Sequence, residues 1–233
     1  MNKTNSKMNT STILAFLLLC TGTHLRAALI TAFGAGGDGL GPGIGYTFGV
    51  DLAETDSGSF ASHVGAWSWE DQNVAPEGGK GWTHTSNWVA LTLLAPAKLT
   101  LTLSANSTVP YIGSGNVGGF AAIDNFFPGT TLYQNWDNDG SDLHIYENTT
   151  NVSWAEDLTY LAHLTTTTDH TITGTWTLAA GQYTLALGSN SPAIANPPRQ
   201  GYTAIFNTVP VPEPAMTGLL LLTSLGLLRR QRA

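Results

Sequence analysis

The sequence contains almost no cysteine, with Cys20 the single example in 233 residues. Cys20 ends an apolar run that begins at Ile13 and follows the cations Lys3 and Lys7. A positive start, a short apolar stretch and small residues after it are typical of a secretory signal peptide, so we predict a cleaved signal helix over residues 1–28. The mature chain would then have no thiol, which excludes disulfide bonds, thiolate catalysis and four-cysteine zinc sites.

Positive charge is also scarce. Nine Lys and Arg residues stand against sixteen Asp and Glu, for a formal net charge of −7. Only Lys80, Lys98 and Arg199 fall between Leu29 and Val209, so the body of the protein is more acidic than the whole chain indicates. An acidic surface repels the phosphate backbone, and nucleic acid is therefore not expected as a partner. Such a body suits an exported protein and attracts divalent cations.

Recognisable catalytic motifs are missing as well. There is no G-x-S-x-G and no H-E-x-x-H, and the acid pairs Glu70–Asp71 and Glu156–Asp157 are sequence neighbours, which point to opposite sides of a strand. The segment Gly34–Gly39 fits G-x-G-x-x-G, but further Gly and Pro residues follow it in place of the helix that a dinucleotide site needs. We therefore predict a surface loop there, and a protein that is not an enzyme.

Sustained helical periodicity is the last absence, and short strand-like runs take its place. The run from Lys98 to Ser104 alternates leucine with threonine, the period-2 pattern of a half-buried strand. The segment Ser153–Leu164 fits either a short helix or a strand with a bulge. We predict an all-β protein with one jelly-roll-like antiparallel β-sandwich over residues 29–207. Its strands are expected at Ala28–Phe33, Trp88–Leu94, Lys98–Ser104, Leu143–Glu147, Thr171–Leu178, Tyr183–Leu187 and Gly201–Asn207.

Tryptophan is concentrated in one window of the sequence. The window runs from His63 to Trp88 and holds four of the seven tryptophans, Trp67, Trp69, Trp82 and Trp88. Exposed indole rings would offer stacking platforms for sugar faces, whereas buried rings would fill the core under a long loop, the arrangement we favour. His63 and His84 would serve as metal ligands if they met, but spacing indicates no third ligand.

A turn rich in Asp and Asn resembles the first half of a calcium loop. Its oxygen-bearing residues are Asn135, Asp137, Asp139, Ser141 and Asp142, with a glycine that permits a sharp turn. The resemblance fails at position twelve, where a bidentate acid is required and Tyr146 stands. The segment fits either a Ca²⁺-binding turn between strands or an ordinary hairpin turn, and Ca²⁺ is the one cofactor that the sequence suggests.

The end of the chain, residues 208–233, has three parts in order. Pro212 and Pro214 hold Glu213 on an extended segment, because proline fixes its own backbone and disfavours helix before it. An apolar run from Ala215 to Leu228 follows; as a helix it would be about 21 Å long, which is shorter than the roughly 30 Å hydrocarbon core of a membrane. The basic residues Arg229, Arg230 and Arg232 close the chain and would stay on the cytoplasmic side.

This order resembles the PEP-CTERM sorting signal of Gram-negative bacteria. The resemblance implies processing by an exosortase, a membrane transpeptidase, after a transient stay in the inner membrane through the C-terminal apolar helix. It further implies delivery to the outer surface or extracellular matrix of cells that make exopolysaccharide. Two other segments, Gly140–Tyr146 and Leu178–Leu185, weakly resemble the pre-peptidase C-terminal family of extracellular β-sandwich modules.

Together these features predict an exported, non-enzymatic surface or matrix protein that is sorted through its C-terminal signal. The alternative is a glycan-binding β-sandwich module, assisted by Ca²⁺ or not. The two hypotheses differ in what they ask of the tryptophan window, which only the second requires to be exposed.

Overall fold

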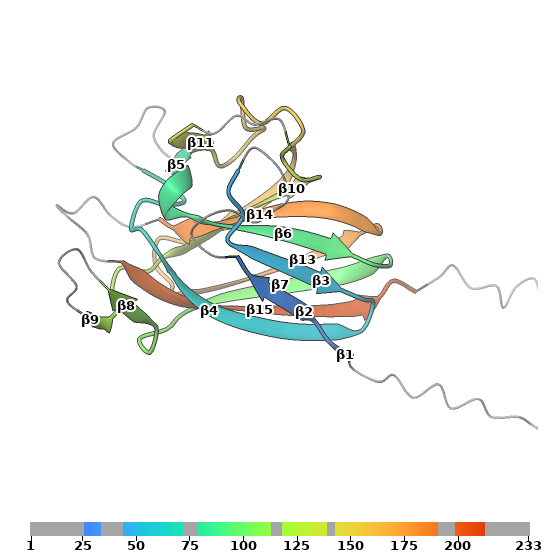
Figure 1. Cartoon of the computed structure of the whole chain (residues 1–233), viewed down its shortest axis with the longest axis horizontal. Coiled ribbons are helices and arrows are strands. Elements are labelled where there is room, and N and C mark those ends of the chain that lie inside the picture. Colours follow the sequence, from blue (N-terminus) through green and yellow to red (C-terminus); the bar gives the residue numbers. More distant parts are fainter. Residues whose placement is uncertain are drawn as a thin grey trace, which may run out of the picture.

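The computed structural model describes residues 26–33, 44–71, 79–112, 118–138, 143–190 and 199–212. These residues form an all-β fold, which confirms the predicted class (Figure 1). Its one helical element in the described ranges is the 3₁₀ turn η1 (Thr83–Thr85). No helix in the described part of the chain is long and apolar enough to cross a membrane. Residues 1–25 of the predicted signal helix and the predicted C-terminal apolar helix lie outside the described residues. Arg26 and Ala27, which were predicted to end the signal helix, instead form a strand, because they pair with residues 56–57.

The first large sheet has five strands. Their order is β1 (Arg26–Ala27), β4 (Asp56–Val64), β15 (Gln200–Pro210), β7 (Ala97–Ala105) and β13 (Thr171–Leu178). The alternating sequence of strand β7 explains why it forms. Leu99, Leu101 and Leu103 are at most 1% exposed, whereas the threonines between them face outward. On that outer face the hydroxyls of Thr100 and Thr102 bond those of β13 across the strand pair, at 3.1 and 3.0 Å.

The second large sheet has six strands. Their order is β12 (Thr159–Thr165), β10 (Pro128–Gln134), β14 (Gly181–Ser189), β6 (Asn87–Leu93), β3 (Phe48–Leu52) and β2 (Leu29–Ala32). Strands β6, β10 and β14 are buried along nearly their whole length, so both faces of this sheet are covered. The apolar run of β6, Trp88–Leu91, reflects this burial on two sides.

Both large sheets contribute to one hydrophobic core. Strands β7 and β15 supply it from the five-stranded sheet, and β3, β6 and β14 supply it from the six-stranded sheet. A second apolar cluster covers the opposite face of the six-stranded sheet, with Trp88, Tyr133 and Tyr146 at its centre. Two short ribbons complete the fold: β5 (Lys80–Trp82) pairs with β11 (Ile145–Glu147), and β8 (Pro110–Ile112) pairs with β9 (Gly118–Phe120).

Two features differ from the expected antiparallel sandwich, and a third confirms one of the two alternatives expected for residues 153–164. Strands β1 and β4 pair in parallel, and so do β3 and β6, so the two large sheets are mixed. Strand β15 continues through Pro210, beyond the expected boundary at residue 207, because the side chain of Thr208 is buried and holds the end of the strand. The ambiguous segment Ser153–Leu164 contains β12, a strand whose pairing with β10 is interrupted by a register shift.

Candidate metal site

Two histidines are brought together by the short β5–β11 ribbon. Trp82 pairs with Ile145 in this ladder, and the backbone N–H of Thr83 donates to the carbonyl of His144 at 2.9 Å. His84 follows at once on the 3₁₀ turn η1, so its ring lies beside that of His144. The two ring centroids are 4.7 Å apart with an interplanar angle of 68°, and both side chains are exposed.

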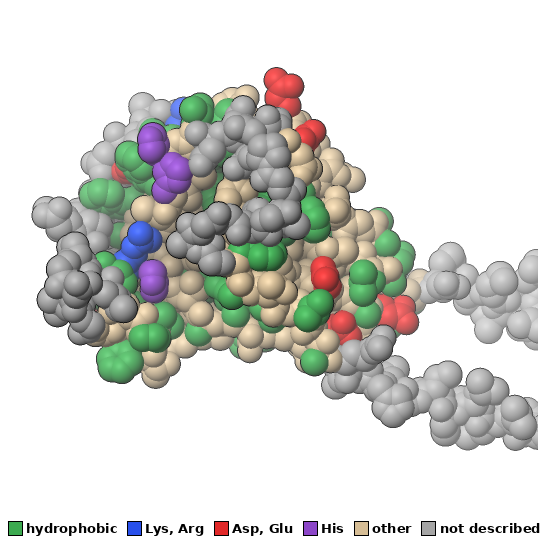
Figure 2. Space-filling model, in the orientation of Figure 1, with side chains coloured by type: hydrophobic (Ala, Val, Ile, Leu, Met, Phe, Trp, Pro, Cys, Tyr) green, Lys and Arg blue, Asp and Glu red, His purple; other side chains and the backbone are tan. Residues whose placement is uncertain are grey.

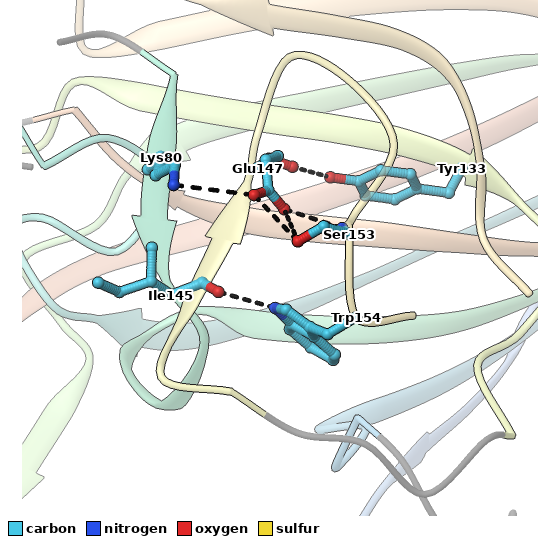
Figure 3. A network of polar contacts seen from close by, with 6 residues as sticks. All are labelled: Lys80, Tyr133, Ile145, Glu147, Ser153 and Trp154. Carbon is cyan, nitrogen blue, oxygen red and sulfur yellow. Dashed lines mark hydrogen bonds and ion pairs between the residues drawn. The ribbon is translucent and has the colours of Figure 1, made fainter. Parts of the chain in front are cut away.

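A network of polar contacts fixes β11, the strand that follows His144 (Figure 3). The carboxylate of Glu147 accepts hydrogen bonds from the backbone N–H and the hydroxyl of Ser153 and lies 3.8 Å from Lys80 Nζ. Trp154 donates through Nε1 to the carbonyl of Ile145 at 2.8 Å, and Tyr133 donates to the carbonyl of Glu147 at 2.7 Å. These bonds hold the ribbon to the second apolar cluster, so His144 projects from a supported strand end.

Hydrogen bonds made by Trp82, Asp71 and Trp88 hold the segment that carries His84. Trp82 donates through Nε1 to Asp71 Oδ2 at 2.5 Å, and the backbone N–H of Asp71 donates to the carbonyl of Lys80 at 2.7 Å. Trp88 donates through Nε1 to the carbonyl of Thr83, the residue before His84, at 3.2 Å. Asp71 is 3% exposed, and its carboxylate serves the fold by accepting the hydrogen bond from Trp82.

The spacing of the two imidazoles suits a shared metal ion. With metal–nitrogen bonds of about 2.0 Å, two imidazoles on one ion have ring centroids roughly 4.5–5.2 Å apart when the bonds diverge by about 90–109°. The observed 4.7 Å falls in that range. In the described ranges no group of three or more His, Cys, Asp or Glu residues is placed to hold a metal. Figure 2 shows histidine side chains together on the surface, over the region that Figure 1 labels β5.

The four tryptophans of the predicted glycan site do not share one surface. Trp69 and Trp88 are 1% exposed and belong to the interior, so the structure removes both from the stacking interpretation. The reason is local, because Trp69 donates to Thr131 and Trp88 packs against Tyr146 with ring centroids 4.8 Å apart. Trp67 and Trp82 are half-buried.

The Asp- and Asn-rich turn is only partly described. Asp137 is 2% exposed, its Oδ2 accepts the backbone N–H of Ile44 at 2.7 Å, and its own N–H donates to the hydroxyl of Tyr46. Asn135 has a φ of 69° and donates through its side chain to the carbonyl of Asp157. These bonds tie the turn to a neighbouring segment, a structural use of the residues expected to bind Ca²⁺. Asp139, Ser141 and Asp142 lie outside the described residues.

The remaining predicted residues are dispersed. The ring of His63 contacts Tyr111, with centroids 5.3 Å apart, whereas that of His84 contacts His144. His63 and His84 therefore do not meet, and the neighbour of His84 is His144, which the β5–β11 ladder brings near. Burial raises the pKa of Glu70, whose neighbour Asp71 is engaged with Trp82. Of the sorting-signal residues, Pro212 is exposed at the end of the described chain, and the others, Glu213, Pro214, Arg229, Arg230 and Arg232, lie outside it.

Comparison with solved structures finds distant likenesses. No family model matches the chain, and no curated protein matches it. Among solved structures, CorA of Methylomicrobium album BG8, a surface-associated copper-binding protein, is similar over 70% of this chain and 98% of its own, with 16% identity and a TM-score of 0.44. MopE, a secreted copper-binding protein of Methylococcus capsulatus, is similar over 79% of this chain and 94% of its own, with 12% identity and a TM-score of 0.39. Likenesses of this degree carry no argument about function.

Proposed function

We propose that this protein binds a transition-metal ion on its surface through His84 and His144, and that copper is the preferred metal. The observation that carries the proposal is the contact of two exposed imidazoles at 4.7 Å on a supported ribbon. Imidazole nitrogen suits copper, zinc, nickel and iron, and among the divalent ions copper binds such ligands most tightly. With two protein ligands from the described chain, water or an external ligand would complete the coordination.

The surroundings of the pair favour binding over catalysis. Both rings stand on the outside of the fold, where an ion can be exchanged with the medium, and the ribbon beneath them is held by Trp154, Tyr133 and Glu147. The acidic body supplies a negative field that concentrates cations near the site. The function we infer is therefore capture or carriage of a metal ion by a non-enzymatic protein.

Metal titration of purified mature protein tests the proposal. Isothermal titration with Cu²⁺ should give one site, and electron paramagnetic resonance of the bound ion should show coupling to two nitrogens. His84→Asn and His144→Asn should each remove one nitrogen from the spectrum and weaken affinity at least about tenfold. His63→Asn is the matched control, because its ring contacts Tyr111 and not another histidine. Unchanged affinity in the double variant His84→Asn/His144→Asn would overturn the proposal.

This function would be exercised outside the cell, by a protein whose body is a single jelly-roll-like β-sandwich. The signal peptide would export the protein, and an exosortase would sort it through the C-terminal signal. The order of the proline-bracketed Glu213, the apolar run and the terminal arginines supports this part of the proposal. Glu213→Ala in the native host should leave the tail uncleaved, as read by mass spectrometry of the C-terminus. Identical C-termini in the variant and the wild type would contradict a sorting role.

Glycan binding remains a second candidate, on a smaller surface than the sequence suggested. The half-buried Trp67 and Trp82 are the rings that keep part of their surface accessible, and Trp82 adjoins the histidine pair. Binding to the exopolysaccharide of the native host, lost on Trp82→Ala and insensitive to chelators, would favour this candidate. Binding of no host polysaccharide would leave metal capture as the function of this surface.

A further inference from the structure

A β-bulge places a tyrosine and a histidine on one face of β12. Tyr133 of β10 pairs with Tyr160 and Leu132 pairs with Ala162, so Leu161 is the extra residue. Residues three apart on a regular strand point to opposite faces, but the bulge restores Tyr160 and His163 to the same face, because their partners Tyr133 and Thr131 are two apart. The Tyr160 hydroxyl and His163 Nδ1 consequently lie 2.6 Å apart in a hydrogen bond.

Tyr160 is also the outer end of a row of aromatic rings. Its ring meets that of Tyr133 edge-on at a centroid distance of 6.4 Å, and Tyr133 stacks with Trp88 at 6.4 Å. Trp88 in turn contacts Tyr146 at 4.8 Å. Trp88, Tyr133 and Tyr146 are at most 1% exposed, so the row leads from the interior of the second apolar cluster to the surface at β12. Successive rings at these spacings are in direct packing contact, close enough for an electron to pass between them.

The tyrosines of this row differ in what their hydroxyls can do with a proton. Tyr133 donates to the carbonyl of Glu147 and Tyr146 donates to the carbonyl of Ser68, and a backbone carbonyl is too weak a base to accept the proton that an oxidised phenol releases. Burial also raises the pKa of Tyr133, which makes loss of its proton harder. Tyr160 alone among the three has an imidazole nitrogen as its partner. Loss of an electron is therefore easiest at Tyr160.

We propose that Tyr160 and His163 form a redox-active site that gives up one electron to an oxidising radical at the surface. The electron leaves the phenol for the radical, and the hydroxyl proton moves along the hydrogen bond to His163 Nδ1, which yields a neutral phenoxyl radical and an imidazolium. A one-electron donor from the medium then reduces the phenoxyl, and the imidazolium returns the proton. If Trp88 or Tyr133 loses an electron, Tyr160 supplies one to it through the row of rings. The Tyr160–His163 pair thereby shields Trp88 and Tyr133 from irreversible oxidation.

The test uses flash-generated ruthenium(III) tris-bipyridyl as the one-electron oxidant on the mature, metal-free protein, so its outcome is independent of metal binding. Wild-type protein should give a tyrosyl radical with a solvent isotope effect in D₂O. Tyr160→Phe should abolish most of that signal and raise oxidation products on Trp88 and Tyr133 severalfold, as read by peptide mass spectrometry. His163→Ala should slow radical formation at least about tenfold, and added imidazole should restore it in part.

Tyr111→Phe is the matched control. Tyr111 also lies beside a histidine, but its contact with His63 is between ring edge and ring face at 5.3 Å and includes no hydrogen bond. We expect this variant to match the wild type in radical yield and in oxidation of Trp88. A Tyr160→Phe variant with wild-type yield and unchanged damage to Trp88, or a His163→Ala variant, folded by circular dichroism, that forms the radical at the wild-type rate, would overturn the proposal.

Discussion

Substitution of Gly129 by alanine tests whether Trp69 is a fixed core residue. A Cβ at Gly129, on β10, would lie 2.3 Å from Trp69 Cδ2 and 2.4 Å from Trp69 Cγ, well inside van der Waals contact. The indole cannot move away, because its Nε1 donates to Thr131 Oγ1 at 3.0 Å and its backbone N–H donates to Ser189 at 3.0 Å. The ring is also buried at 1% exposure. One methyl group therefore has no space to enter.

Two opposing contributions set the expected size of the effect. Overpacking a core costs about 1–3 kcal/mol, and an overlap with several atoms of a rigid ring places this case near the upper end. Alanine is favoured over glycine inside a strand by roughly 0.5–1 kcal/mol, which offsets part of that cost. We expect Gly129→Ala to lower the free energy of unfolding by about 2 kcal/mol, with a lower urea midpoint and an unchanged slope.

Gly119→Ala, on β9, is the control for the Gly129 experiment. Nothing lies within 4 Å of a Cβ at that position, so this variant should be as stable as the wild type or slightly more stable. In a Trp69→Ala background, Gly129→Ala should cost much less than in the wild type, because that background lacks Cγ and Cδ2, the atoms nearest the added methyl group. A Gly129→Ala variant that unfolds at the wild-type midpoint would refute the placement of Trp69.

Two further predictions concern the five-stranded sheet. Thr208→Val should cost about 1–3 kcal/mol in a urea titration, because the buried Thr208 hydroxyl accepts the N–H of Asp56 at 2.9 Å and donates to a backbone carbonyl. The exposed Thr173→Val should change stability by less than about 0.5 kcal/mol, and equal losses in the two variants would contradict this reasoning. Burial, together with the positive charge of Arg199, lowers the pKa of His63 below its ordinary value of 6.5. The unfolded chain therefore binds the proton more readily, so stability is fully present above about pH 6.5 and is lost as the pH falls through that value toward the folded pKa. Thermal unfolding across this range should show a shallower decline for His63→Gln than for the wild type, and parallel curves would exclude the contribution.

Sequence patterns predicted the strands in which the residue types show which positions are buried. The alternation of Leu99, Leu101 and Leu103 predicted β7, and the runs Thr171–Leu178 and Tyr183–Leu187 predicted β13 and most of β14. Strands β4 and β10 escaped prediction because small and polar residues dominate β4, and because β10 begins with Pro128 and Gly129. Each forms because neighbouring strands bond it on both sides, which is a property of the sheet and not of the segment.

The candidate metal site was less accessible to sequence reasoning. His84 stood out in the tryptophan window, but His144 adjoins the other strand of the β5–β11 ribbon, and no local spacing relates the two residues. The Tyr160–His163 pair was hidden for a related reason. The possibility of a bulge could be read from the irregular pattern of Ser153–Leu164, but its position, which decides the face of each side chain, depends on pairing with β10.

The threonines that pair across β7 and β13 leave the outer edge of this sheet open to other molecules. Strand β13 is the last strand of its sheet, and its eight residues, Thr171 to Leu178, include no charge and no proline. Edge strands are ordinarily guarded against adding a strand from another molecule by lysine, proline or a bulge. Here the threonines satisfy one another across the pair and repel nothing. Where many copies of the protein meet at high density, this edge would accept a strand from a neighbouring molecule, and the substitution Thr175→Lys would guard it.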